Sequence, residues 1–131
     1  CETSANTSGS GAVISFRGPV CAAAQDFVLE VDGATPGQFG IFYYGAGNAQ
    51  VPFGNGYRCV GPGGVGLFRF SPVSTGVLGI GTWILDIQSP PQASGQITAN
   101  SIWTFQFWYR DPLAGGANFN LSDGLEVTFC P

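Results

Sequence analysis

Residues 101–110, SIWTFQFWYR, decide the fold class of this chain. Four aromatic side chains fall on one face of the extended segment: Trp103, Phe105, Phe107 and Tyr109. The opposite face carries Ile102, Thr104, Gln106 and Trp108. Alternation with a period of two is the pattern of a β-strand, whereas a helix repeats about every 3.6 residues. The segment is therefore predicted to be a strand, and the strongest one in the chain.

Further short segments with strand character are separated by turns rich in Gly and Pro. They are residues 12–17, 26–32, 38–44, 58–60, 66–70, 77–80, 82–87 and 125–129. Residues 1–11 are small and polar and are expected to form an N-terminal arm, while 45–66 and 111–124 are expected to be mostly loop. About nine short strands without helical periodicity predict one all-β domain over residues 1–131. The expected architecture is an antiparallel β-sandwich, and a jelly roll is one form that fits.

Charge is scarce in this chain. Only 9% of the residues are charged, against roughly 25% in an average soluble domain. The four basic residues are all arginines, scattered along the sequence, and the formal net charge is -4. Nucleic acids and anionic membranes are bound through clustered Lys and Arg, so neither is an expected partner. No apolar run is long enough to predict a membrane span.

The four cysteines are Cys1, Cys21, Cys59 and Cys130. There is no histidine and no C-x-x-C pair, so their even number in a Gly-rich chain predicts two disulfides and a secreted or cell-surface protein. Three pairings are possible. The first and last strands of a sandwich often lie close together, which favours Cys1–Cys130 with Cys21–Cys59. A lipid-modified Cys1 is an alternative that would leave three cysteines to pair.

Catalytic machinery is not expected. Without His or Lys, a Ser-His-Asp triad and lysine chemistry are excluded. Six of the eight acidic residues lie in turns, at strand ends or in the arm, and Glu30 and Glu126 lie on polar strand faces, which disfavours a glycosidase pair. The GPGGVG segment at 61–66 matches a dinucleotide-binding pattern, but a strand is predicted after it where that site needs a helix. We expect a protein that is not an enzyme and needs no cofactor.

Oxygen-bearing side chains crowd the segment before the last predicted strand: Asp111, Asn118, Asn120 and Asp123. Such ligands suit Ca²⁺, although Asp and Asn also favour turns for reasons of local hydrogen bonding. Two N-x-[ST] sequences, at Asn6 and Asn120, match the N-glycosylation acceptor pattern. Arg110 is expected to tie this loop to Asp123 or Glu126 as a structural clamp.

Exposed aromatic rings on a sandwich face are a means of binding sugars. The candidates are Trp108, Tyr43, Tyr44 and Tyr57. Trp108 is the most informative, because it lies opposite the main aromatic face of its strand. The alternative is that both faces of the strand are covered by a loop or a neighbouring subunit, which is the commoner fate of aromatic residues.

The second half of the chain carries a long motif: FQFWYRD at 105–111, Gly115–Gly116, and NLSDGLEVTF at 120–129. With VPFGNGYRCVGPGG at 51–64 and the opening CETSANTSGSGAVIS, it resembles a terminal domain of large secreted, mostly uncharacterised bacterial proteins. The resemblance implies an extracellular all-β module and no particular activity. Cys21 is additional to that pattern, which leaves the partner of Cys59 open.

Two functional hypotheses follow. The first is a non-enzymatic extracellular structural or adhesive module that assembles with copies of itself, into a fibre or surface matrix, through its charge-poor strand edges. The second is a carbohydrate-binding accessory module of a secreted protein. The expected partners are other copies of the chain, surface proteins or polysaccharide.

Overall fold

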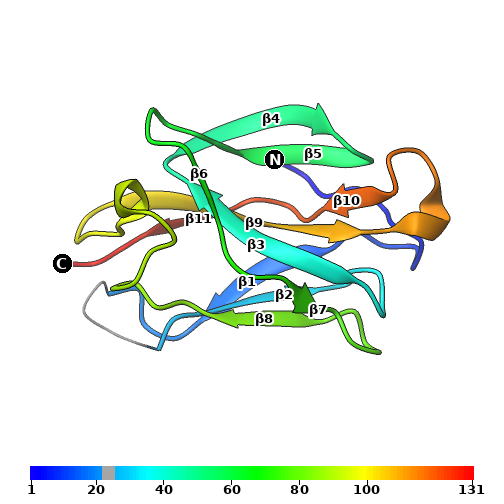
Figure 1. The fold of residues 1–131 in the computed structure, drawn as a ribbon, viewed down its shortest axis with the longest axis horizontal. Coiled ribbons are helices and arrows are strands. Elements are labelled where there is room, and N and C mark those ends of the chain that lie inside the picture. The colour runs from blue at the N-terminus through cyan, green and yellow to red at the C-terminus, as the bar shows by residue number, and fades with distance from the viewer. Residues whose placement is uncertain (22–25) are drawn as a thin grey trace.

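The computed structural model describes residues 1–21 and 26–131, and their 11 strands confirm an all-β, antiparallel fold (Figure 1). The smaller sheet has the order β1-β2-β8. Its strands are β1 (Val13–Arg17), β2 (Val28–Asp32) and β8 (Gly81–Ile84). One face of this sheet turns Ile14, Leu29 and Val31 towards the core, and the other carries the polar residues of the same strands.

The larger sheet is built around β9 (Ile102–Arg110), the strand predicted to be the strongest. On one side β9 pairs with β3 (Phe39–Gly45), which pairs in turn with β6 (Leu67–Arg69) and β7 (Val73–Ser74). On the other side it pairs with β10 (Phe119–Leu121) and β11 (Leu125–Thr128). The inner face of β9 packs in the core, and the hairpin described below packs on part of its outer face, so both faces carry large side chains.

A hairpin of β4 (Gly47–Phe53) and β5 (Gly56–Gly61) forms a separate two-stranded sheet on the outer face of the larger sheet. In Figure 1 the hairpin, the larger sheet and the smaller sheet follow one another from top to bottom. The expectation of a mostly loop-like 45–66 segment, with a strand only at 58–60, was therefore wrong. Its Gly, Asn and Pro content lowers intrinsic strand propensity, but packing against the sheet overrides that propensity.

Two other boundaries differ from the prediction. Residues 77–80 were expected to be a strand, but they form a turn in which the Val77 side chain is 90% exposed and Gly76 and Gly79 have positive φ. The 111–124 segment, expected to be loop, contains β10. Apolar spacing alone cannot distinguish an exposed apolar turn from a short strand. The 61–66 segment is followed by strand β6, as expected.

The main core lies between the two sheets and is largely aromatic. The four aromatic residues of one β9 face are all buried: Trp103, Phe105, Phe107 and Tyr109. Tyr44 of β3 packs among them, with its ring centroid 5.3 Å from those of Trp103 and Phe105. Aromatic pairs at such spacings stabilise a core beyond the area they bury.

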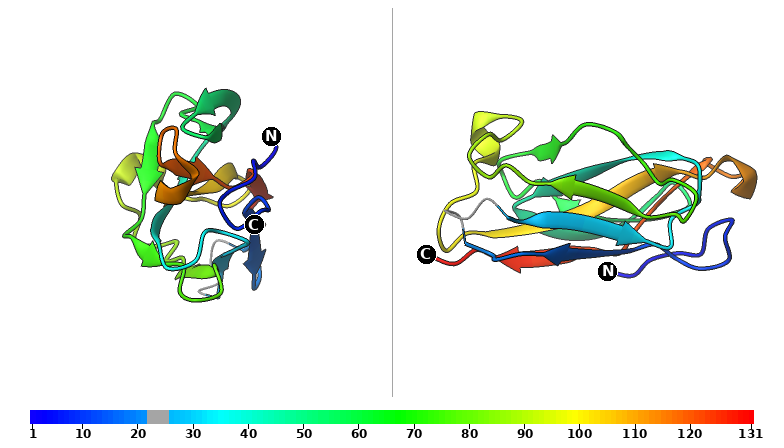
Figure 2. Two further views of the ribbon diagram at one scale, coloured as in Figure 1. Left: turned by 90° about the vertical axis from the view of Figure 1, so that its right-hand side faces the viewer. Right: turned by 90° about the horizontal axis from the view of Figure 1, so that it is seen from below.

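The first and last strands meet along one side of the sandwich, as Figure 2 shows from below in dark blue and red. The amide of Asp123 donates to the carbonyl oxygen of Ala12, and the amide of Cys130 donates to that of Val20 (2.7 Å). We call this contact between residues 12–21 and 123–130 the seam. A disulfide joins Cys21 to Cys130 on the seam, and the second disulfide joins Cys1 to Cys59. The favoured pairing was therefore wrong, although its premise of adjacent first and last strands was right. Cys21 lies four residues after the end of β1 (21 − 17), whereas Cys1 lies twelve residues before its start (13 − 1).

The N-terminal arm is packed against the domain. Cys1 is bonded to β5 through Cys59, so its sulfur is not free for a lipid. The amide of Asn6 donates to the carbonyl oxygen of Ser10, which folds the arm into a turn. Among the described residues, helical structure is confined to Ala93–Gly95 and Pro112–Ala114, and no helix can cross a membrane.

Candidate functional site

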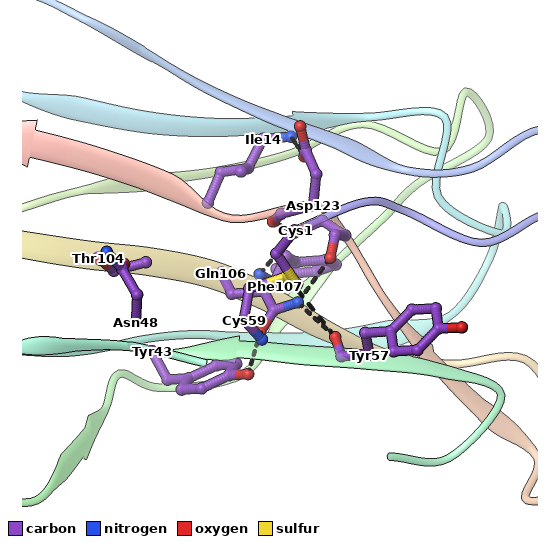
Figure 3. Close-up of a disulfide and its surroundings, with 11 residues drawn as sticks. Cys1, Ile14, Tyr43, Asn48, Tyr57, Cys59, Thr104, Gln106, Phe107 and Asp123 are labelled. Atoms are coloured by element: carbon purple, nitrogen blue, oxygen red, sulfur yellow. Dashed lines mark hydrogen bonds between the residues drawn. A yellow bond between two sulfur atoms is a disulfide. The ribbon is translucent and has the colours of Figure 1, made fainter. Parts of the chain in front are cut away.

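The outer face of β9 is half covered by the hairpin. At the covered end, Gln106 is fully buried, and the nitrogen and the oxygen of its side-chain amide each form two hydrogen bonds (Figure 3). Its Nε2 donates to the carbonyl oxygens of Tyr57 (2.8 Å) and Ser122 (2.6 Å). Its Oε1 accepts from the amide of Cys59 (2.8 Å) and from the Tyr43 hydroxyl. One glutamine thus fastens β5 and the β10–β11 connection to the sheet, next to the Cys1–Cys59 disulfide.

Tyr43 and Tyr44 were proposed to contact sugar, and this was wrong because both rings are buried. Tyr43 is 5% exposed beneath the hairpin, and Tyr44 is 1% exposed in the main core, where its hydroxyl donates to the carbonyl oxygen of Gly95 (2.6 Å). Burial raises the pKa of Tyr44 to about 12, and it raises the pKa of Tyr43 further, against the opposing charges of Arg58 and Arg69. Tyr57 is half-buried, and its ring points away from the Gln106 network (Figure 3).

Beyond the end of the hairpin, the outer face of the larger sheet is open and forms a groove of about 420 Å³. Its floor includes Ile41 of β3 and Trp108 of β9, which are direct cross-strand partners. Phe39 and Phe119 line it further, and Phe39 is 61% exposed. Apolar concave surfaces with a few polar groups are the usual form of a ligand site.

Three aromatic rings meet at one wall of the groove. The ring centroid of Trp108 lies 5.5 Å from that of Phe119 and 5.8 Å from that of Phe53, and the Phe53 and Phe119 centroids are 5.2 Å apart. Phe53 comes from the end of β4 and does not itself line the groove, so the hairpin supports the Trp108 and Phe119 rings that do. Gly54, with φ of 59°, permits the close approach, because a Cβ there would lie 2.2 Å from the Phe119 ring. The wall is therefore held by contacts between distant segments.

The polar groups at the groove are Arg110 and Asn118, both exposed. The clamp expected between Arg110 and Asp123 or Glu126 is not formed. The carboxylate of Asp123 accepts from the Ile14 amide (2.9 Å), and that of Glu126 accepts from the Asn48 side chain (2.7 Å). Arg110 lies on the same face as Trp108 and projects into the groove region instead.

Three of the four proposed calcium ligands, Asp111, Asn120 and Asp123, are hydrogen-bonded to different segments of the fold. The Asp111 carboxylate is fully buried and accepts from the Thr7 amide (3.1 Å), the Thr7 hydroxyl (2.5 Å) and the Thr35 hydroxyl (2.9 Å). Asp123 holds β1, as described above, and Asn118 has a left-handed backbone with φ of 65°. No group of three or more His, Cys, Asp or Glu residues suited to a metal occurs in the described part of the chain. These residues fasten the arm and shape the turn, so the structure gives their side chains roles that do not require calcium.

Both proposed glycosylation acceptors were also wrong, because their amide nitrogens are used inside the fold. Asn6 is 7% exposed, and its Nδ2 donates to the carbonyl oxygen of Gly33 (2.7 Å) and to the Tyr109 hydroxyl (2.9 Å). Asn120 is fully buried, and its Nδ2 donates to the carbonyl oxygens of Ser4 and Ala5. The two asparagines bind the arm to the domain.

Trp108 is the proposed sugar contact that the structure places in the groove. The sequence interpretation missed Phe39, Phe53 and Phe119, which are brought to it from three different segments. Their only sequence signal was residue type, because Phe53 and Phe119 lay in segments expected to be loop. The register between strands brings two further residues to the groove: Phe119 lies opposite Arg110, and Ile41 lies opposite Trp108.

Comparison with known proteins gives no relative: the chain matches no protein-family model, no curated protein and no solved structure. What the domain binds must be inferred from its own residues.

Proposed function

We propose that this domain is a non-enzymatic, extracellular adhesive module that binds carbohydrate in the aromatic groove. The observation that carries the proposal is the half-exposed Trp108 ring, held between Phe53 and Phe119 in a groove of about 420 Å³. An aromatic ring that is buried on one side and open on the other offers an apolar platform to the C–H face of a sugar ring. The polar groups of Arg110 and Asn118 can hydrogen-bond sugar hydroxyls at its edge.

Two further features support a binding rather than a catalytic role, and an extracellular location. Among the described residues lining the groove there is no Asp, Glu, His, Lys or Cys, so no general acid, base or nucleophile of the usual types faces a ligand there. The two disulfides are of the kind that persist in oxidising compartments. They lock both the arm and the seam, which suits a domain exposed to extracellular conditions.

Replacing Trp108 with alanine is expected to weaken binding of the best glycan from an array by about 30-fold, because a central aromatic anchor contributes about 2 kcal/mol. Affinity is measured by titration calorimetry after the melting curve has confirmed that the variant is folded. Tyr57→Ala is the matched control: it removes a half-buried aromatic ring that does not line the groove. Equal affinities for the wild type and the Trp108 variant would contradict the proposal, as would the absence of any array signal.

Self-association is a second candidate function, favoured by the edge strand β8. Within the described residues no strand pairs with the free side of β8, and Ile84 on this strand is 70% exposed. The turn before it exposes Val77 and Leu78 by 90% and 74%. Unprotected edges with apolar side chains are the usual template for pairing between chains.

If β8 pairs between chains, sedimentation velocity is expected to detect dimers or larger species at protein concentrations of about 100 μM. Weak pairing with a micromolar dissociation constant is populated at that concentration. Ile84→Lys is expected to return it to monomer, because a charge on an edge strand opposes pairing. Leu113→Lys adds the same charge at a site that is 85% exposed and outside β8. A chain that stays monomeric throughout would refute this second function and leave the groove proposal untouched.

A further inference from the structure

Three of the four arginines lie on the outer side of the larger sheet, two on its own strands and one on the hairpin that covers it. Arg110 lines the groove itself. Arg69 of β6 is the cross-strand partner of Tyr43, so its side chain leaves the sheet on the same outer face. Arg58 lies on β5 two residues before Val60, so both side chains leave that strand on one side, and Val60 packs in the cluster that contains Tyr43. Arginines that are scattered in the sequence are thus gathered by strand register.

The charges of these three arginines are not used within the fold. Among the described residues the one ion pair joins Arg17 to Glu30 (3.5 Å), on the smaller sheet. No hydrogen bond within that part of the chain uses the guanidinium of Arg58, Arg69 or Arg110, and the Nε atom of Arg58 is buried without a partner.

The acidic side chains closest to this face are hydrogen-bonded within the fold. Asp111 is buried beneath the arm, and Asp123 is bonded to β1. Glu126 also lies on the outer face, opposite Thr104, but it accepts from the Asn48 side chain in a separate polar hollow near the Cys1–Cys59 disulfide and does not line the groove. The chain has a net charge of -4, yet the charged residue that lines the apolar groove is the unpaired Arg110, and no acidic residue of the described part of the chain lines it. This asymmetry is selective for a ligand that combines apolar ring faces with anionic groups.

We propose that the ligand of the groove is an acidic polysaccharide, carrying carboxylate or sulfate groups on its sugar rings. The inference rests on the carbohydrate-binding function proposed above and names the class of glycan. Trp108 and Phe119 would contact the sugar rings, while Arg110 in the groove and Arg69, exposed on the same outer face, would bind the acidic groups through their guanidinium groups. A guanidinium presents paired N–H donors that match the two oxygens of a carboxylate or sulfate, and its charge persists at any physiological pH.

The test compares glycans that differ in charge alone. The hexamer of galacturonic acid is titrated against its full methyl ester, which has the same rings without the negative charge. Dextran sulfate and dextran form a second pair. The acidic member of at least one pair is expected to bind at least about tenfold more tightly, since two or three partly exposed charge pairs each contribute up to about fivefold. Raising NaCl to about 0.5 M is expected to remove most of this preference, because salt screens exposed charges.

Variants then locate the charge dependence. Arg110→Gln and Arg69→Gln are each expected to weaken binding of the acidic hexamer, or of dextran sulfate if that is the acid bound, by about fivefold. Arg17→Gln is the matched control, because it makes the same change in net charge on the opposite sheet. It is expected to leave binding unchanged. All three positions are exposed, so folding is checked by melting curve and is expected to survive.

The outcomes separate the two proposals. Equal binding of acidic and neutral glycans that is lost in Trp108→Ala would overturn the acidic preference and keep the carbohydrate function. An acidic preference that is equally weakened by Arg17→Gln, or tighter binding of a single-stranded oligonucleotide than of any acidic glycan, would also overturn the inference. No binding of any glycan in any pair would overturn both proposals.

Discussion

Replacement of Gln106 by leucine is expected to lower the free energy of unfolding by about 4 kcal/mol, since it leaves several buried polar groups without partners at about 1–3 kcal/mol each. Leucine fills similar space but offers no donor or acceptor. The carbonyl oxygens of Tyr57 and Ser122, the amide of Cys59 and the hydroxyl of Tyr43 all lose their partner at once. The measurement is equilibrium unfolding in urea of the oxidised protein.

Thr104→Val is the matched control for this prediction. Thr104 is 4% exposed on the same face of β9, and its hydroxyl donates a single hydrogen bond, to Asn48 (2.5 Å). Valine has nearly the same shape, so the expected loss is about 1 kcal/mol. If the two variants lost the same free energy, the Gln106 network would not be a concerted fastening of the hairpin.

The Gln106 variant is also expected to affect the groove. Phe53 and Gly54 belong to the hairpin and complete the aromatic wall around Phe119. When the hairpin is no longer fastened to β9, the Cys1–Cys59 disulfide still tethers β5 but does not set its distance from Trp108. Hydrogen exchange at the amide of Cys59 is expected to accelerate in this variant more than exchange in β3. Stability of the hairpin and affinity for a ligand are thereby linked.

The fold class could be predicted because its main signal is local. The alternation of residues 101–110 depends only on strand geometry, and burial of Phe105 and Phe107 follows directly from it. The hairpin could not be predicted in the same way. Its residues are mostly Gly, Asn, Gln and Pro, and β4 is largely exposed, so its stability comes from Gln106 and the aromatic wall rather than from its own pattern.

The site could be predicted only where one strand contained the evidence. Trp108 is identifiable because it stands opposite the core face of its own strand. Phe119 and Arg69 are placed on the face of Trp108 by the register between strands, and Phe53 and Arg58 by packing of the hairpin on the sheet. Composition alone made the arginines look scattered. The polar residues Asn6, Asn120 and Asp111 failed as ligand predictions for a related reason. Their partners are in the N-terminal arm or in other loops that fold back over long sequence distances.

Removal of the Cys21–Cys130 disulfide, by replacing both residues with alanine, is expected to lower the free energy of unfolding by about 4–5 kcal/mol. The bond spans 109 residues, so opening it restores much conformational freedom to the unfolded chain. It also lies on the seam where the backbone hydrogen bonds of Cys130 and Asp123 hold the first and last strands together. Both halves of the main core, from β1 and from β11, depend on that seam.

The double variant that removes Cys1–Cys59 is the control, because that loop spans 58 residues and the entropic model gives a nearly equal loss of about 4 kcal/mol. The two variants should lose similar free energies of unfolding but differ in which region of the domain is destabilised. Without Cys21–Cys130, hydrogen exchange is expected to accelerate first in β1 and β11; without Cys1–Cys59, it should accelerate first in the arm and the hairpin. Identical exchange patterns would contradict separate roles for the two bonds. If the roles are separate, the seam with its Cys21–Cys130 bond holds the two sheets of the sandwich together. The Cys1–Cys59 bond and Gln106 together hold the hairpin against the groove. Ligand binding should therefore survive loss of the Cys21–Cys130 bond better than loss of the Cys1–Cys59 bond.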